Sequence, residues 1–221
     1  MIPRPIDAVI FDMDGLLLDS ERLYRDAMRA ACADRGLSLA DGLFERMVGS
    51  SWAMCRQMVA EEFGAAFPAD DFQRESHLHY DRLGANGIPH RPGVAAILAH
   101  LRNAGIPRGV ATSTGTTRAR AKLEQAGILH LFDVLVGADD VARHKPDPEP
   151  YLLAASRLGA RPAHCVALED SHNGVRAAAA AGMATIMIPD MLPSTDETDR
   201  LCVATLESLD HVVDLLIAAG R

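Results

Sequence analysis

The chain has 221 residues and a formal net charge of -8, with 48% hydrophobic and 24% charged residues. This mix is typical of a folded soluble protein and excludes an intrinsically disordered chain, which lacks the apolar content to offset the entropy of ordering. We expect no nucleic-acid partner and no membrane partner, because the negative charge disfavours polyanionic surfaces and no apolar run approaches the roughly 20 residues of a membrane span.

The first residues and the cysteines predict the compartment. Residues 1–4 lead into a strand-like segment without the apolar stretch and cleavage site of a signal peptide. The four cysteines stand far apart, with no spacing typical of metal ligands, so we expect reduced thiols. Both features predict a cytoplasmic protein. Of the 22 basic residues only Lys122 and Lys145 are lysine, so a mechanism that needs an amine has two candidates.

Short apolar, β-branched runs alternate along the chain with stretches of helical spacing. The expected strands are 6–11, 108–111, 132–136, 165–168 and 184–188. The helical stretches between them are 94–101, 118–126, 151–158 and 175–181. Alternation of strand and helix favours parallel strands joined by right-handed crossovers. We therefore predict an α/β fold with a doubly wound parallel sheet.

The alternation is interrupted once, after the first strand. Four helical stretches follow one another there without a strand, at 21–35, 42–48, 52–63 and 70–83. We interpret this block as an inserted α-helical cap domain over residues 18–87, with 84–89 as a hinge. Residues 1–17 and 88–221 then form the α/β catalytic core domain.

Two pairs of acidic residues follow expected strands. Asp12 and Asp14 come after the first strand, and Glu169 and Asp170 come after the fourth. Ligands bind outside the carboxyl ends of parallel strands, so these pairs should face one crevice. Carboxylates so close resist joint ionisation unless a cation lies among them, and an oxygen-rich site suits Mg²⁺. An exposed acidic turn and an acidic helix N-terminus are the alternatives.

Hydroxyls and a lysine follow the other two strands. Thr112, Ser113 and Thr114 precede a helix, where hydroxyls and free amides form an anion site or an ordinary N-cap. Lys145 stands before Pro146, which keeps it out of a helix, and offers a compact point charge. The order of acids, hydroxyls, lysine and acids along successive strands predicts phosphoryl transfer, where positioning and charge stabilisation do most of the work.

Four segments resemble, in order, the motifs of the haloacid dehalogenase superfamily. They are FDMDGLLLDSE at 11–21, VATST at 110–114, HKPDP at 144–148 and ALEDSHNGV at 167–175. The resemblance covers nearly the whole chain and implies a Rossmann-like core. The helical insertion is similar to the cap of the β-phosphoglucomutase-like branch. Within that branch, the segments FDMDGLLLDSERLY and AGMATIMIPD resemble phosphatases of sugar phosphates and of pseudouridine 5′-phosphate.

The resemblance implies a Mg²⁺-dependent phosphatase that hydrolyses a small phosphorylated metabolite, similar to a sugar phosphate or a nucleoside monophosphate. Asp12 would be the nucleophile and form an aspartyl-phosphate. Asp14 would protonate the leaving alcohol and then deprotonate the hydrolytic water. Thr112 and the amide of Ser113 would hold phosphoryl oxygens, and Lys145 would neutralise charge beside the nucleophile.

The resemblance also implies the metal ligands. These are the side chains of Asp12 and Asp170 and the main-chain carbonyl of Asp14, with Glu169 bound directly or through water. The substrate-binding prediction adds Ser113 and Thr114 on the core side. On the cap side it adds Tyr24, Trp52, Arg56 and His77, for which helical packing or solvated surface is the alternative. We expect a monomer or a weak dimer.

Other functions fit the sequence less completely. A dehalogenase would leave Asp14 and the second acid pair without a role. Phosphonate cleavage in this superfamily needs a cap lysine, and residues 16–90 contain none. A β-phosphoglucomutase-like mutase would carry a cap histidine where Tyr24 stands and a cap arginine where Trp52 stands, although Arg46 and Arg56 could substitute. A noncatalytic phosphate-binding module is the alternative from another class.

Overall fold

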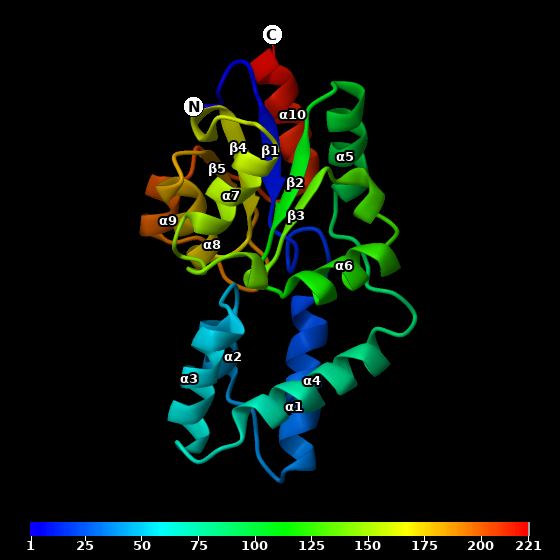
Figure 1. Cartoon of the computed structure of the whole chain (residues 1–221), viewed down its shortest axis with the longest axis vertical. Coiled ribbons are helices and arrows are strands. Elements are labelled where there is room, and N and C mark those ends of the chain that lie inside the picture. The colour runs from blue at the N-terminus through cyan, green and yellow to red at the C-terminus, as the bar shows by residue number, and fades with distance from the viewer. Residues whose placement is uncertain (221) are drawn as a thin grey trace.

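The computed structural model describes residues 1–220, apart from the side chains at positions 41, 219 and 220. Six strands form one parallel sheet in the order β3-β2-β1-β4-β5-β6. The strands are β1 (Ala8–Phe11), β2 (Arg108–Ala111), β3 (Val134–Val136), β4 (Cys165–Glu169), β5 (Ala184–Met187) and β6 (Ala204–Thr205). The sheet lies at one end of the molecule, and four helices gather at the other (Figure 1). The predicted doubly wound α/β fold is confirmed.

Helices cover both faces of the sheet because the side chains of β1 alternate between them. Val9 and Phe11 pack in a cluster with α5 (Val94–Asn103), α6 (Thr116–Gln125) and α10 (Leu209–Gly220). Ala8 and Ile10 pack with α7 (Glu149–Arg157) and α8 (His172–Ala180) on the opposite face. Helix α9 (Asp196–Leu201) packs against α8. Short 3₁₀ turns occupy Leu129–Leu131, Ala138–Asp140 and Pro162–His164.

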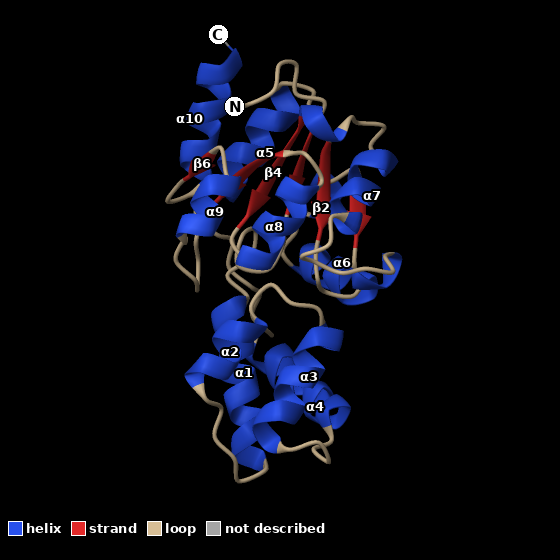
Figure 2. Cartoon of the chain, turned by 90° about the vertical axis from the view of Figure 1, so that its left-hand side faces the viewer, coloured by secondary structure: helices blue, strands red, loops and turns tan. Residues whose placement is uncertain are grey.

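The other end of the molecule is a group of four helices with a core of its own (Figure 2). They are α1 (Glu21–Asp34), α2 (Asp41–Met47), α3 (Trp52–Phe63) and α4 (Ala69–Leu83). Met28, Leu43, Val59 and Phe72 are fully buried between them. Truncating a buried Phe to Ala typically costs about 3–5 kcal/mol, so the burial of Phe72 contributes substantially to the stability of this group.

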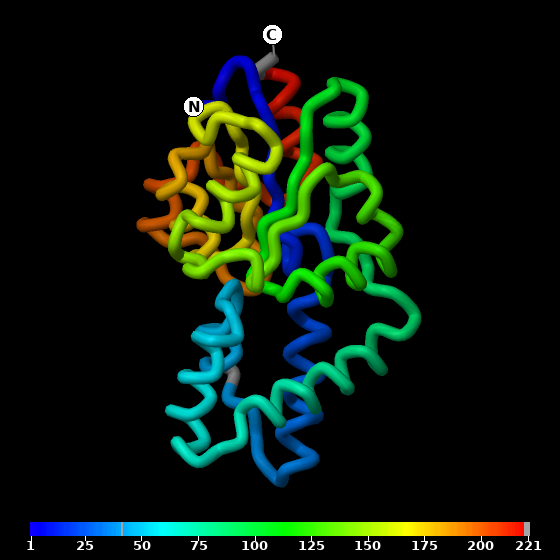
Figure 3. Tube along the Cα trace, in the orientation of Figure 1, coloured from blue at the N-terminus to red at the C-terminus, as the bar shows by residue number. Residues whose placement is uncertain are grey.

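Two chain segments connect these helices to the sheet, and they run side by side. Figure 3 traces the chain from β1 into α1 and back from α4 to α5. Leu18 forms an antiparallel bridge with His90. The amide of Asp19 donates to the carbonyl of Pro89 at 2.9 Å, and the amide of Arg91 donates to the carbonyl of Leu17 at 3.0 Å. These hydrogen bonds hold the two connecting segments side by side between the sheet and the four helices.

Several boundaries differ from the sequence prediction. The strand expected at 132–136 begins at Val134, and α6 begins at Thr116 rather than at Arg118. The prediction omitted α9, α10 and β6. Strand β6 has only two residues, one of them exposed, so it carries no apolar run for a pattern to detect. Within the described residues, no helix combines the length and the hydropathy that crossing a membrane requires.

Candidate active site

The predicted acids and hydroxyls meet at the carboxyl edge of the sheet. Asp12 follows β1, Thr112 follows β2 and Asp170 follows β4. Phe11 pairs in register with a residue of β2 on one side and a residue of β4 on the other, so Asp12 lies between the two neighbouring strand ends. Its amide donates to the carbonyl of Leu168 at 2.9 Å. Parallel pairing therefore brings together side chains that are far apart in the sequence.

Lys145 connects two of the carboxylates. Its Nζ lies 2.6 Å from Asp12 Oδ1 and 2.6 Å from Glu169 Oε1. The side chain is only 1% exposed. Burial would lower the pKa of Lys145, but Asp12 and Glu169 hold that pKa above its usual value. Lys145 is therefore a fixed positive charge beside Asp12, and charge-assisted hydrogen bonds of this kind are strong.

Glu169 is saturated with hydrogen bonds. Oε1 accepts from Lys145 and from the Tyr151 hydroxyl at 2.7 Å. Oε2 accepts from the amides of Asp170 and Ser171, each at 3.2 Å, and from the Ser171 hydroxyl at 3.0 Å. Five donors on a fully buried carboxylate fix the turn after β4 and the lysine together. This carboxylate acts on Asp12 through Lys145.

Two glycines leave the space that the carboxylates occupy. A Cβ at Gly174 would lie 1.8 Å from Glu169 Oε1. A Cβ at Gly15 would lie 2.3 Å from Asp170 Oδ2, and Gly15 also has φ +88°, which L-residues rarely adopt. A larger residue at either position would displace a carboxylate. The glycines of the first and fourth motifs therefore have a steric role at the site.

The acids at this edge form a donor set suited to a divalent cation. Ligand oxygens of Asp12, Glu169 and Asp170 lie within 4.8 Å of one another. Asp170 Oδ2 is buried and has no hydrogen-bond partner among the described atoms. Burial, opposed by Lys145, raises the pKa of Asp12 to about 7, and burial next to Asp12 raises the pKa of Asp170 well above its usual value. Lys145 is one positive charge beside three carboxylates, so the cluster keeps an excess of negative charge, and hard oxygen ligands fit Mg²⁺.

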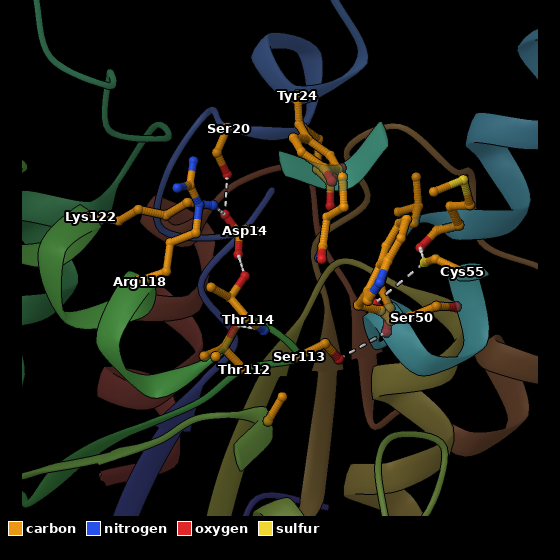
Figure 4. Close-up of a pocket in the computed structure, with 18 of the residues that line it drawn as sticks. Asp14, Ser20, Tyr24, Ser50, Cys55, Thr112, Ser113, Thr114, Arg118 and Lys122 are labelled. Atoms are coloured by element: carbon orange, nitrogen blue, oxygen red, sulfur yellow. Dashed lines mark hydrogen bonds and ion pairs between the residues drawn. The ribbon is translucent and has the colours of Figure 1, made fainter. Parts of the chain in front are cut away.

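Asp14 is held by three donors on the side of the site that faces the cap (Figure 4). Oδ1 accepts from Ser20 at 2.6 Å and from Lys122 at 2.6 Å, and Oδ2 accepts from Thr114 at 2.7 Å. Burial would raise the pKa of Asp14, but Lys122 and the two hydroxyls bring that pKa below its usual value. Asp14 is therefore an ionised carboxylate in the structure.

A cavity of about 420 Å³ extends from Asp12 and Asp14 toward the cap helices. One wall comes from α2, α3 and the loop between them and is mostly apolar, with Phe44, Met47, Val48, Trp52 and Cys55. The opposite wall is polar, with Gln73, His77, Arg118 and Lys122. Burial lowers the pKa of His77 to about 4, so this imidazole is neutral near pH 7. The cavity can hold a small molecule with an apolar face and a polar edge.

All but one of the predicted substrate-binding residues line the cavity. Tyr24, Trp52 and His77 line the cavity, as do Ser113 and Thr114. The Ser113 hydroxyl donates across to the carbonyl of Gly49 in the cap at 3.1 Å.

Arg56 corrects the prediction. It does not line the cavity: its side chain is 62% exposed and lies 3.4 Å from Asp70. On α3 this residue lies on the solvent side, one turn after Trp52, whose indole N–H also donates to Asp70 at 3.1 Å.

Several residues of the site were not predicted, among them Ser20, whose hydroxyl donates to Asp14. Lys122 contacts Asp14, and Tyr151 contacts Glu169. Glu21 is buried at the cavity, and burial together with the nearby Asp14 raises its pKa to about 8. The scarcity of lysine singled out Lys122, but its place in a helical stretch gave no sign of its partner. Tyr151 read as an ordinary residue of an apolar helix face.

Comparisons with known proteins identify the family of the chain. The model of the haloacid dehalogenase-like hydrolases matches residues 6–182. A curated protein of Thermotoga maritima named phosphorylated carbohydrates phosphatase is 34% identical, over 82% of this chain and 84% of its own length. The crystal structure of CbbY from Rhodobacter sphaeroides in complex with phosphate is 30% identical, with a TM-score of 0.79, covering 94% of this chain and 96% of its own.

A third match is to the fold alone. A β-phosphoglucomutase structure from Clostridium difficile is 22% identical, with a TM-score of 0.83, over 97% of this chain and 96% of its own. The family model spans most of the chain, and the match to the Thermotoga maritima phosphatase covers more than four fifths of both chains. The chain belongs to the haloacid dehalogenase-like hydrolases.

Proposed function

We propose that this hydrolase is a Mg²⁺-dependent phosphatase that transfers the phosphoryl group of a small phosphomonoester to Asp12 and then to water. The carrying observation is that Asp12 lies 2.6 Å from the buried ammonium of Lys145, at the floor of a cavity that Asp14 also lines. A nucleophilic carboxylate beside a fixed cation, with a second carboxylate toward the leaving group, suits in-line phosphoryl transfer.

In the first step, a carboxylate oxygen of Asp12 attacks phosphorus, and the bond from phosphorus to the alcohol oxygen breaks. Protonated Asp14 gives its proton to that oxygen, so the product leaves as an alcohol. A bound phosphoryl dianion favours the protonated form of Asp14, because like charges disfavour ionisation. Lys145 offsets the charge that collects around Asp12, and Thr112 and the amide of Ser113 hold phosphoryl oxygens.

In the second step, Asp14 acts as a base. It takes a proton from water, the hydroxyl oxygen attacks phosphorus, and the bond to Asp12 breaks to release inorganic phosphate. The hydrogen bonds from Ser20 and Thr114, at 2.6 and 2.7 Å, orient the carboxylate for this proton transfer. One side chain can serve both steps because the first step leaves it in the form that the second step needs.

Asp12, Asp170 and the main-chain carbonyl of Asp14 would hold Mg²⁺, which supplies positive charge against the phosphoryl oxygens when it is bound. The unpartnered buried oxygen of Asp170 supports its assignment as a ligand. Glu169 has no free hydrogen-bonding capacity on either oxygen in the structure, since five donors already contact it. We assign it to holding Lys145, with any contact to the ion made through water.

The segment 18–87 is proposed to act as a cap that closes over the substrate, excludes water and contributes specificity. Its contacts to the core support this role: Ser113 donates to Gly49 at 3.1 Å, and Asn173 donates to Ser50 at 3.1 Å. We propose a phosphorylated carbohydrate or a nucleoside monophosphate as substrate, because the cavity has one apolar wall and one polar wall. The curated relative named for phosphorylated carbohydrates points the same way.

The cap chemistry favours a phosphatase over a mutase. A mutase must hold a second phosphate at the cap, which requires basic groups. Arg46 and Arg56 are both exposed, pair with Glu62 and Asp70 and do not line the cavity. His77 does line it, and its lowered pKa of about 4 keeps it neutral. Family membership as a hydrolase argues against a noncatalytic phosphate binder.

The direct test is phosphate release with Mg²⁺ across hexose, pentose, polyol and nucleoside monophosphates, with glucose 1-phosphate also assayed for isomerisation. We expect release of phosphate from at least one class and no isomerised product. Isomerisation without phosphate release would establish the mutase instead. Retained binding of a phosphate mimic without any hydrolysis would contradict the proposed function.

A further inference from the structure

Helix α6 of the core carries several contacts to the end of the cap helix α4. Arg118, near the start of α6, donates to Asp81 at 2.8 Å. Gln125, at the end of α6, donates to the carbonyl of Gly84 at 2.9 Å. Lys122 lies between them, four residues after Arg118 and three before Gln125, and this spacing places all three on one face of the helix. Through this face of α6 the core contacts the end of α4, and we call these contacts the seating of α4 on the core.

Lys122 has a different partner on each side. Toward the cap, its ammonium lies 4.7 Å from the centre of the Tyr80 ring, on α4. Toward the active site, the same nitrogen lies 2.6 Å from Asp14 Oδ1. Lys122 is 9% exposed and Tyr80 is 3% exposed, so water does not separate the three groups. A desolvated cation against an aromatic face is held more strongly than an exposed one.

We propose that Lys122 is a positioning residue, which places the Asp14 carboxylate for proton transfer and links that placement to the seating of α4 on the core. This inference rests on the proposed function, since it concerns the role of Asp14 in phosphatase chemistry. The hydroxyls of Ser20 and Thr114 also hold Asp14, but both are neutral and neither contacts Tyr80.

The link follows from the surroundings of the ammonium. If α4 lifts from α6, Tyr80 leaves Lys122 and water replaces the ring. The attraction between the ammonium and Asp14 then weakens, because charges interact less in a medium of higher dielectric constant. Asp14 is thus held most firmly when the cap is closed over the substrate, and an open enzyme has a less ordered acid–base group.

The test compares two substrates in Lys122→Met. The value of kcat/KM reports events up to departure of the leaving group. An alkyl phosphate such as glycerol 2-phosphate needs a proton from Asp14 at that point, whereas p-nitrophenolate departs without one. We expect kcat/KM for the alkyl phosphate to fall by about 100-fold, the usual scale for a displaced proton donor, and that for p-nitrophenyl phosphate by less than about 5-fold.

Two further variants test the link to the cap. Tyr80→Leu should also reduce kcat/KM for the alkyl phosphate selectively, by about 10-fold. In the Lys122→Met background the same substitution should lower kcat/KM by less than about a further 2-fold, because the effects of residues that act through one another are not additive. Arg120→Gln is the control on the same helix. Its side chain is exposed and lies off the face of α6 that contacts α4, so both substrates should stay within about 2-fold of the wild-type value.

The outcomes separate the inference from the proposed function. Equal losses for both substrates in Lys122→Met would mean a structural role and overturn the inference, as would additive effects of Tyr80→Leu and Lys122→Met. If Lys122→Met does not fold, Lys122→Gln replaces it with the same expected selectivity. A wild-type protein that releases phosphate from none of the hexose, pentose, polyol and nucleoside monophosphates would overturn the proposed function itself, and this inference with it.

Discussion

The carboxyl edge of the sheet and the cap wall hold their side chains in different ways. At the edge, Lys145 is 1% exposed and Glu169 is fully buried, and every oxygen of Glu169 has a partner. In the cap, Tyr24 and His77 are half-buried, and their ring centres lie 5.9 Å apart. The indole N–H of Trp52 donates a hydrogen bond to the exposed carboxylate of Asp70.

This difference suggests that the sheet edge carries out the chemistry and that the cap wall recognises the substrate. Charges that are fixed before the substrate arrives need no reorganisation as the reaction proceeds, so the edge is suited to stabilising a transition state. The cap side chains are held by fewer contacts, and replacing one changes the shape of the cavity without disturbing the buried charges. Changes at the edge should therefore act on kcat for every substrate, and changes in the cap should act on the choice among substrates.

The largest effect should come from the nucleophile. Asp12→Asn keeps the size of the side chain but removes the carboxylate that attacks phosphorus. We expect turnover to fall by at least about 10⁴-fold in steady-state assays, with an unchanged circular dichroism spectrum. Asp7→Asn is the matched control, because Asp7 pairs with Arg161 on the surface at 2.8 Å and should leave activity unaltered. Activity of Asp12→Asn near the wild-type level would contradict the mechanism.

Removing the fixed cation should be the next largest change. Lys145→Ala leaves Asp12 and Glu169 as buried carboxylates without their common partner. We expect kcat to fall by about 10³-fold for alkyl and aryl phosphates alike, because the charge acts on the phosphoryl group itself. Unfolding in urea should show a loss of about 3–5 kcal/mol, the usual cost of breaking a buried ion pair. A loss confined to one substrate would place Lys145 in recognition instead.

The metal prediction can be tested by binding as well as by turnover. Asp170→Asn removes the charge of the carboxylate whose Oδ2 has no partner among the described atoms. Calorimetric titration should show weaker Mg²⁺ binding, and kcat should fall by about 100-fold or more, since a catalytic metal contributes several kcal/mol. Chelation of the wild-type enzyme should abolish activity, and added Mg²⁺ should restore it. Full activity in the presence of a chelator would rule out the metal.

A steric change at the edge should be smaller but should affect both stability and rate. In Gly174→Ala the added Cβ would lie within 1.8 Å of Glu169 Oε1. The carboxylate of Glu169 must move, and Lys145 moves with it. We expect the free energy of unfolding to fall by about 1–3 kcal/mol, the usual cost of overpacking. We also expect kcat to fall with little change in KM. Gly42→Ala offers a comparison, because a Cβ there meets only the end of the Arg46 side chain, at 3.9 Å. Unchanged stability of Gly174→Ala would show that the site is looser than described.

The cap should give the smallest effect on chemistry and a clear effect on selectivity. Trp52→Ala removes the largest side chain of the apolar wall. We expect the ranking of substrates to change, with kcat/KM for the preferred one falling by about 10-fold, the scale of a lost apolar pocket contact. Activity with p-nitrophenyl phosphate should stay within about 3-fold. Leu78→Ala, on the exposed side of α4, controls for general damage to the cap. An unaltered profile would remove Trp52 from substrate recognition.

The sequence predicted the edge of the sheet better than the cap. Asp12, Thr112, Lys145 and Asp170 directly follow strands or lie in the connecting loops, and parallel pairing brings such positions together whatever the details of packing. The position of Arg56 depends on how α3 turns against its neighbours, which its sequence spacing did not determine.

Lys122 and Tyr151 were missed for a related reason. Both lie within helices, where periodicity describes which face is buried but not which distant residue that face contacts. Lys122 reaches Asp14 across 108 positions, and Tyr151 reaches Glu169 across 18 positions. Strand β6 was missed because two residues at the sheet edge form no pattern.

The central claim is that Asp12 becomes covalently phosphorylated during turnover. Mixing the enzyme with Mg²⁺ and p-nitrophenyl phosphate, quenching in acid within milliseconds and mapping peptides by mass spectrometry tests it directly. We predict a phosphoryl group on the peptide that contains Asp12, appearing before steady-state release of phosphate and absent in Asp12→Asn. Full release of phosphate with no adduct at Asp12 at any quench time, or an adduct on another residue, would contradict the account.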